Sequence, residues 1–202
     1  MDNPQATDGE LGWLAGIIDG DGWVGVCVET EHWYRTGHNT RQKSIRTEVR
    51  ITNTDMGIID HAAEIMRKIG INPYIRQQGK TKNGTKVYDV STKRMKSVAI
   101  LLRPLVSHLA GTKRERAQLV LDFIESRKAN PGVPNPAYAN AGEEPGRKGP
   151  RTIRPYNEEE LDIVERCIDL QTRKGASETT REARKRDLQK MRRKYHQLSE
   201  VI

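Results

Sequence analysis

Apolar residues recur along the chain with two different periods. Over residues 10–22 they cover nearly every side of a helix, which predicts a helix, capped by Asp8, that is buried on more than one face. Period-two alternation then predicts a strand from residue 24 to about residue 34, a loop at 35–40 and a second strand. The second strand has Ile45, Val49 and Ile51 inward, and its outward positions are all polar: Ser44, Arg46, Glu48, Arg50 and Thr52.

A helix and a hairpin are predicted next. Apolar residues at helical spacing over 56–69, after the capping residue Asp55 and before Gly70, predict a covering helix. Asn-Gly at 83–84 lies between two alternating segments, which is a strong signal for a β-hairpin. The first strand of this hairpin is expected to place Tyr74, Arg76 and Gln78 on one face.

Two further helices are predicted over 95–109, with a kink or break at Pro104, and over about 114–126. The order helix, two strands, helix, two strands, helices indicates an α+β unit over residues 1–127, in which helices cover one face of an antiparallel sheet. Nothing is predicted to cover the other face. We expect that face to be solvated or to bind a partner.

The rest of the chain divides into a linker and a helical segment. Residues 128–155 contain six prolines and four glycines, which predicts an extended linker with no strand or helix. Asn157 followed by three glutamates predicts a helix N-terminus, and the apolar residues of 161–170 form one stripe. A last, basic helix is predicted from the capping box Thr179 and Glu182 to about Leu198, so that residues 156–202 form a C-terminal helical segment.

The charge and cysteine content narrow the function. The chain has 35 Lys and Arg against 27 Asp and Glu, a net charge of +8 that favours a polyanionic partner, nucleic acid first. No stretch approaches the roughly 18 apolar residues of a spanning helix, and no secretion signal opens the chain, so no membrane partner is expected. Cys27 and Cys167 are too few and too far apart for a disulfide framework, which favours an intracellular location.

Two aspartates end the first helix. Asp19 and Asp21 lie at its predicted C-terminus, where the helix dipole disfavours negative charge by about 0.3–1 kcal/mol. A hard divalent cation held by carboxylate and carbonyl oxygens would reverse this penalty. The alternative is that the four residues 19–22 are only a turn into the next strand.

Residues 14–22, Leu-Ala-Gly-Ile-Ile-Asp-Gly-Asp-Gly, resemble the LAGLIDADG motif of homing endonucleases, with two mild replacements. The resemblance implies an αββαββα unit whose saddle-shaped sheet lies along the DNA major groove. It also implies that Asp21 binds the catalytic metal beside the carbonyl of Gly20, while Asp19 shapes the helix end. Because the motif occurs once, it implies a homodimer whose motif helices pack through Gly12, Ala15 and Gly16.

The resemblance implies further site residues. Asn53, with Thr54 as the alternative, lies where the family has a polar residue near the metal and the attacking water. Lys113 resembles the family's active-site lysine and would lie near the scissile phosphate. Taken alone, each residue is equally compatible with an ordinary solvated side chain.

Base recognition is expected from outward sheet residues, because arginine suits guanine and glutamate suits cytosine. These residues are Glu29, Arg46, Glu48, Arg50, Tyr74, Arg76 and Gln78. The segments 172–174 and 177–179 resemble the C-terminal segment of algal chloroplast members of the family, which flanks the DNA there. The cations of the last helix would then bind phosphates, or else form a solvated tail: Arg181, Arg184, Lys185, Lys190, Arg192, Arg193 and Lys194.

The expected function is site-specific cleavage of double-stranded DNA by a homodimer. Mg²⁺ is the expected cofactor, with Mn²⁺ or Ca²⁺ able to occupy the site, and the target would be a near-palindrome of about 20 bp. An RNA-splicing maturase and a non-cleaving DNA-binding regulator are the alternatives on the same fold. The sequence does not distinguish an intron from an intein as the origin.

Overall fold

The computed structural model describes residues 5–35, 38–134, 152–171 and 178–200. They form the predicted α+β fold, in which helices and antiparallel strands alternate in the expected order. The elements are α1 (Asp8–Asp21), β1 (Gly22–Arg35), β2 (His38–Asn53), α2 (Met56–Lys68), β3 (Tyr74–Lys80), β4 (Lys86–Thr92), α3 (Met95–Leu105), α4 (Gly111–Ala129), β5 (Val133–Pro134), β6 (Thr152–Ile153), α5 (Glu158–Asp169) and α6 (Glu178–Glu200).

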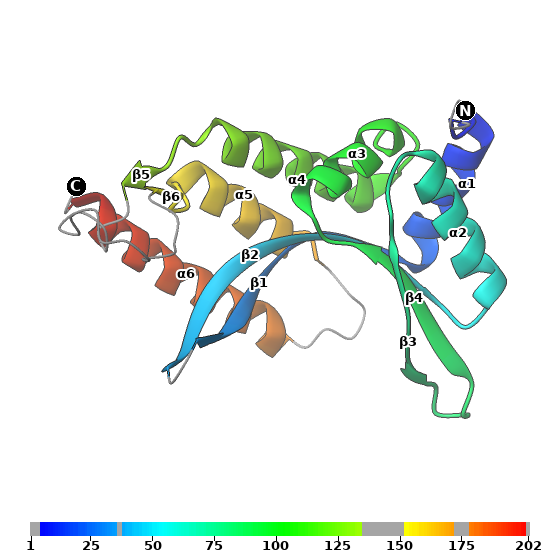
Figure 1. The fold of residues 1–202 in the computed structure, drawn as a ribbon, viewed down its shortest axis with the longest axis horizontal. Helices are drawn as coiled ribbons and strands as arrows, with labels where there is room; N and C mark the ends of the chain where they lie inside the picture. The colour runs from blue at the N-terminus through cyan, green and yellow to red at the C-terminus, as the bar shows by residue number, and fades with distance from the viewer. Residues whose placement is uncertain (1–4, 36–37, 135–151, 172–177, 201–202) are drawn as a thin grey trace.

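The main sheet has four strands in the order β1-β2-β4-β3, and neighbouring strands are antiparallel. Its two hairpins, β1–β2 and β3–β4, bend away from the centre like the two sides of an arch (Figure 1). Helices α1 to α5 lie on the convex side of the arch (Figure 1). This arrangement confirms the α+β unit with a saddle-shaped antiparallel sheet.

The core lies between the helices and the convex face of the sheet. Alternate strand residues point into it, and those of the central strands, such as Val49, Ile51 and Val90, are fully buried. From the other side α1 contributes Leu14, Ala15 and Ile18, which lie on one side of the helix, while Gly12 and Gly16 are exposed. Within the single chain the helix is therefore fully buried on one face, and the expected burial on more than one face is not found.

Local signals fixed several element boundaries. Asp55 caps α2 by accepting a hydrogen bond from the Gly57 backbone, and Gly84 has the positive φ of 82° that its turn requires. The prediction that Asp8 caps α1 is wrong: Thr7 is the N-cap, and it forms a capping box with Glu10. Helix α3 ends at Leu105, before the predicted end at residue 109, and Pro104 lies inside its last turn without dividing it.

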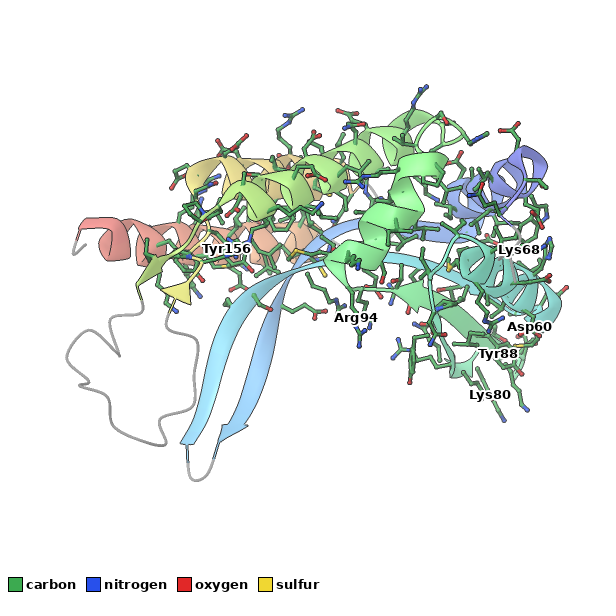
Figure 2. All side chains as sticks on the ribbon, turned by 45° about the horizontal axis from the view of Figure 1, so that its top comes forward. Asp60, Lys68, Lys80, Tyr88, Arg94 and Tyr156 are labelled. Atoms are coloured by element: carbon green, nitrogen blue, oxygen red, sulfur yellow. The ribbon has the colours of Figure 1, made fainter. Side chains whose placement is uncertain are left out.

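Glu10 also joins α1 to α2. Its carboxylate accepts a hydrogen bond of 2.6 Å from Lys68 Nζ on α2, a residue labelled in Figure 2, and one of 2.8 Å from the Thr7 backbone. The hydrogen bond from Lys68 is the main reason that the pKa of Glu10 falls from 4.5 to about 2. The motif helix is thus held by an ionised carboxylate.

We expect this contact to make stability depend on pH in acid. Since folding lowers the pKa of Glu10, its contribution is complete above about pH 4.5 and is lost as the pH falls toward 2. The melting temperature of Glu10→Gln should therefore lie below that of the wild type at pH 6, and the gap should close between pH 4.5 and 2. A gap that stays constant over this range would contradict the assignment.

The linker prediction needs two corrections. Helix α4 continues to Ala129, beyond the expected boundary at residue 127, and the short strands β5 and β6 pair with each other. The prediction of no helix or strand in 128–155 is therefore wrong at both ends of that segment. Residues 135–151 lie outside the described part of the chain.

The C-terminal helices pack against the β1–β2 hairpin. The hydroxyl of Tyr156 accepts a hydrogen bond of 3.0 Å from the Ile45 backbone, and Gln171 Nε2 donates one of 2.9 Å to the carbonyl of Val26. Lys43 forms an ion pair of 2.6 Å with Asp187 on α6. The C-terminal segment with α5 and α6 therefore packs on the β1–β2 hairpin, at the end of the molecule opposite α1 (Figure 1).

Among the described residues, no helix combines the length and apolar character needed to cross a bilayer.

Candidate functional site

The chain passes from α1 directly into β1 at a point where only glycine fits. A Cβ on Gly22 would lie 2.6 Å from the Cα of Ile18, and the Gly22 backbone donates to the carbonyl of Ile18. This close turn leaves the carboxylate of Asp21 exposed at the end of the helix. The acid therefore lies where the motif helix meets the sheet.

Asn53, at the end of β2, holds Asp21. Its Nδ2 donates to Asp21 Oδ2 at 2.7 Å, while its Oδ1 accepts a hydrogen bond of 2.8 Å from the Asp55 backbone. The second contact fixes the orientation of the amide, so the amino group must point at the carboxylate. The structure thus brings together two of the predicted site residues, and the Asn53 amide orients the Asp21 carboxylate.

Lys113 and Asp19 join the end of α1 to the start of α4. Lys113 Nζ donates to the carbonyls of Ile18 and Asp19, the latter at 2.7 Å. In return, Asp19 Oδ2 accepts a hydrogen bond of 3.0 Å from the backbone of Ala110, the N-cap residue of α4. The lysine supplies the positive charge that the C-terminus of α1 lacks in its own sequence.

The donors at this site suit a hard divalent cation in kind. Asp21 offers a carboxylate oxygen, and Gly20 offers its backbone carbonyl oxygen. Mg²⁺ accepts both kinds of ligand. Among the described residues, no three His, Cys, Asp or Glu side chains cluster to form a complete cage. Mg²⁺ usually needs only one or two carboxylates, with phosphate oxygens and waters completing its shell. The residues present therefore fit Mg²⁺ as part of its ligand shell, with the remaining ligands coming from outside these residues.

The predicted base-reading residues occupy the concave face of the sheet. Strand register places Tyr74, Ser91 and Arg50 in one row across β3, β4 and β2, and Arg76, Asp89 and Thr52 in the next row. Tyr74 is 62% exposed, the most exposed large apolar side chain in the described chain. This face presents polar groups and an aromatic ring to the open space under the arch.

Arg46 and Glu48 lie on this face, but they are largely occupied by neighbours. One terminal nitrogen of Arg46 binds Glu29 and the other binds Glu48 at 3.1 Å. Glu48 is only 3% exposed and also lies 3.7 Å from Lys93 Nζ. The prediction that Glu48 presents a carboxylate to a base is therefore wrong, because its neighbours cover it.

Cys27 lies in the same buried network. Burial, more than any neighbouring charge, raises the pKa of its thiol to about 11. Both cysteines of the chain are buried and free, and burial also raises the pKa of Cys167. Neither thiol has the ionised form that nucleophilic chemistry or metal binding needs near neutral pH.

The three residues of the predicted dimer face of α1 differ in exposure. Gly12 and Gly16 are exposed, and a Cβ at either position would meet no atom within 4 Å. Ala15, in contrast, is fully buried in the core of the chain and cannot belong to a surface interface. Ala15 directly precedes Gly16, and adjacent residues of an α-helix differ by about 100° around its axis. Ala15 therefore points to the core, while Gly12 and Gly16 lie on the exposed side.

The cations of α6 mostly pair within the chain. Arg192 binds three carboxylates of α5, those of Glu158, Asp162 at 2.6 Å and Glu165 at 3.0 Å. Asp169 binds Arg181 at 2.5 Å and Lys185 at 2.7 Å, and these two contacts outweigh burial and lower the pKa of Asp169. The expectation that these three cations bind phosphates is replaced by a role in docking α6 on α5.

The sequence did not reveal three further residues at the concave face. Asp89 on β4 is fully buried and binds Arg76, while Lys93 and Arg94 follow β4 where the two hairpins separate. Figure 2 shows the exposed Arg94 side chain pointing into the space between the hairpins. Alternation along β4 could have placed Asp89 on this face, whereas nothing local signals the position of Lys93 or Arg94.

Comparison with known proteins points to one family. Residues 34–120 match the LAGLIDADG-like domain model, a range that lies entirely after the motif of residues 14–22. No curated protein sequence matches the chain significantly. The sequence motif and the domain match are therefore independent observations on different residues.

Several solved structures share the fold. The homing endonuclease I-CvuI, solved in complex with the I-CreI target in the presence of Mg, aligns with a TM-score of 0.52 at 15% identity, over 93% of this chain and 94% of that one. The homing endonuclease I-TnaI aligns with a TM-score of 0.51 at 14% identity, over 90% and 97%. An archaeal intron-encoded homing endonuclease complexed with DNA gives 0.52 at 12% identity, over 91% and 97%. The chain thus carries a LAGLIDADG-like domain and has the fold of the LAGLIDADG homing endonucleases, which confirms the resemblance inferred from residues 14–22.

Proposed function

We propose that the protein is a site-specific, divalent-metal-dependent DNA endonuclease that acts as a homodimer. The observation that carries this proposal is the exposed Asp21 carboxylate, oriented by Asn53 at the junction of the motif helix and an open, polar sheet face. The net charge of +8 and the DNA complexes of proteins with the same fold support DNA as the partner.

The chain's own residues would share the work of phosphodiester hydrolysis. When bound at Asp21 and the Gly20 carbonyl, a divalent cation such as Mg²⁺ would stabilise charge on the phosphate and make water more acidic. Asn53 holds the Asp21 carboxylate in a fixed orientation through its 2.7 Å hydrogen bond. Lys113, at the carbonyls of Ile18 and Asp19, places a positive charge beside the expected position of the scissile phosphate.

The direct test is cleavage of a randomised DNA library. We expect incubation with Mg²⁺ to yield cut ends that share one near-palindromic sequence of about 20 bp, and EDTA to prevent cutting. Selection of a common sequence without any cutting would favour a non-cleaving regulator. A protein that neither binds nor cuts DNA, but stimulates splicing of an intron RNA, would be a maturase.

A dimer is proposed because one chain supplies one Asp21, whereas two DNA strands must be cut. The exposed Gly12 and Gly16 would allow two copies of α1 to approach closely. At both positions a side chain would have free space within the single chain. Substitutions there can therefore disturb an interface without disturbing the fold.

We expect Gly16→Leu to convert the dimer into a folded monomer. Replacing a glycine inside an exposed helix should leave the melting temperature of the chain unchanged or raised, because glycine costs roughly 1 kcal/mol in a helix interior. Sedimentation velocity measures the association state, and Glu115→Leu on the exposed surface of α4 is the matched control. An unchanged dimer in Gly16→Leu would place the interface on another face.

A further inference from the structure

Arg76 is clamped by a fully buried carboxylate. Its Nε lies 3.1 Å from both oxygens of Asp89, the residue directly opposite on β4. Asp89 is 0% exposed, and one of its oxygens also accepts a hydrogen bond of 3.0 Å from Gln78 Nε2. Gln78 lies in the bulge between Gln77 and Gly79, which lets it reach back to the same carboxylate. Both side chains that flank Asp89 are thus ordered by it.

The clamp leaves the recognition end of the arginine available. Asp89 uses only the Nε of Arg76, and the two terminal nitrogens make no hydrogen bond to any described residue. The Arg76 side chain remains 42% exposed on the concave face. A guanidinium presents two terminal donors in a fork that matches O6 and N7 of guanine in the major groove.

Arg46 provides a contrast on the same face. Its two terminal nitrogens are bound by Glu29 and Glu48, so the fork is already occupied by carboxylates. Its Nε is buried without a hydrogen-bond partner. The two arginines therefore differ in the atoms that are bound: Asp89 binds Arg76 at Nε, whereas Glu29 and Glu48 bind Arg46 at its two terminal nitrogens.

We propose that Asp89 is a positioning residue that holds Arg76 for recognition of a guanine, and that Arg46 has a structural role and reads no base. This inference rests on the proposed function, since it assumes that DNA lies under the arch. Asp89 already orders the Arg76 side chain in the free protein, so little side-chain entropy is lost when DNA binds. An arginine without such a partner would lose that entropy on binding. Asp89 itself contacts no base, because it has no exposed surface.

The position of Arg76 indicates where the guanine lies in the half-site. Arg76, Asp89 and Thr52 occupy one row across β3, β4 and β2, and Thr52 directly precedes Asn53 of the candidate metal site. Two strand spacings, about 10 Å, separate β3 from β2. The guanine is therefore expected in the inner part of each half-site, closer to the cleaved bonds than to the bases facing the hairpin tips.

The test measures binding, so that it does not depend on cleavage. The target is selected by binding of the wild-type protein to random DNA in Ca²⁺, and the affinity of each single-base variant is then measured. The wild type should prefer guanine at one inner position of each half-site by about 5- to 150-fold. Asp89→Asn keeps the shape of the side chain, and it should reduce that preference by roughly 2- to 10-fold, while preferences elsewhere stay the same.

A double-mutant cycle separates positioning from direct contact. Arg76→Lys keeps a positive charge beside Asp89 and removes the fork, so it should abolish the guanine preference while non-specific affinity is retained. In that background Asp89→Asn should change the preference no further. Arg46→Lys is the matched comparison, because it keeps the positive charge beside Glu29 and Glu48, and it should leave every base preference unaltered. Melting temperatures of all variants show whether each one is folded.

Three results would overturn the inference. A wild-type protein that selects no DNA sequence would remove both the inference and the proposed function. A selective wild type whose Asp89→Asn variant keeps the full guanine preference would remove the inference alone. A further loss on adding Asp89→Asn to Arg76→Lys would mean that Asp89 contacts a base itself.

Discussion

Asp21→Asn is expected to abolish strand cleavage and to leave specific DNA binding intact. The substitution removes the negative charge that would hold a divalent cation, while an asparagine oxygen can still accept the 2.7 Å hydrogen bond from Asn53. The sheet face that would contact bases is unchanged. The loss in cleavage rate should be at least about 10²–10³-fold, the size typical for removing one electrostatic contribution at an active site.

The measurement is single-turnover cleavage of a plasmid that carries the selected target, alongside binding to the same target in Ca²⁺. Asp60→Asn is the matched control, because Asp60 is an exposed aspartate on α2 (Figure 2) and the chemical change is identical. That variant should cleave at the wild-type rate. Undiminished Mg²⁺-dependent cutting by Asp21→Asn would show that the metal is held elsewhere.

Arg127→Ala is expected to destabilise the protein by about 3–5 kcal/mol, the usual cost of removing one partner of a buried ion pair. Arg127 on α4 binds Glu160 at 3.1 Å, and the two side chains are 14% and 0% exposed. It also donates to the carbonyls of Arg154 and Pro155, and its guanidinium lies 4.5 Å from the centre of the Tyr156 ring. Alanine would leave a buried carboxylate and two carbonyls without this partner.

For a chain of this size the loss corresponds to a fall in melting temperature of roughly 6–20 °C. Arg103→Ala provides the comparison, because Arg103 pairs with Glu125 at 2.7 Å but both side chains are more than half exposed. Exposed pairs of this kind contribute little to stability, so this variant should melt close to the wild type. Equal melting temperatures for the two variants would mean that α4 and α5 are joined by apolar packing alone.

The parts of the fold that the sequence predicts correctly depend on neighbouring residues. The cap at Asp55, the Gly84 turn and the helix N-terminus at Asn157 depend on residues a few positions apart, and each is present. The cap of α1 differs by one residue, since Thr7 and Asp8 are both good capping residues and only the position of Glu10 selects Thr7. Short-range patterns thus predict the elements, but they place some ends three or four residues away from the observed ones, as for α3 and α4.

The details of the site depend on contacts between residues far apart in the sequence. Lys113 reaches the carbonyl of Asp19 across 94 positions, and no local pattern indicates that it ends on α1. The pairing of Arg76 with Asp89 depends on the length of the hairpin turn and on the bulge between Gln77 and Gly79, which fix the register. Net charge also does not show which cations pair with carboxylates of the same chain, so the pairing of Arg192 with acidic residues of α5 does not follow from the sequence.

The docking of the C-terminal helices on the β1–β2 hairpin has a consequence during synthesis of the chain. The hairpin is complete when residue 53 emerges, but the contacts to Val26 and Ile45 come from Gln171 and Tyr156, which follow them by 145 and 111 positions. At about 5–20 residues per second, the ribosome needs roughly 5–30 s to deliver those partners. During that time β1 is a long edge strand that lacks its contacts with α5 and α6, and such edges pair readily with other chains. The newly made protein is therefore most prone to aggregate in the interval between the synthesis of β2 and that of α5.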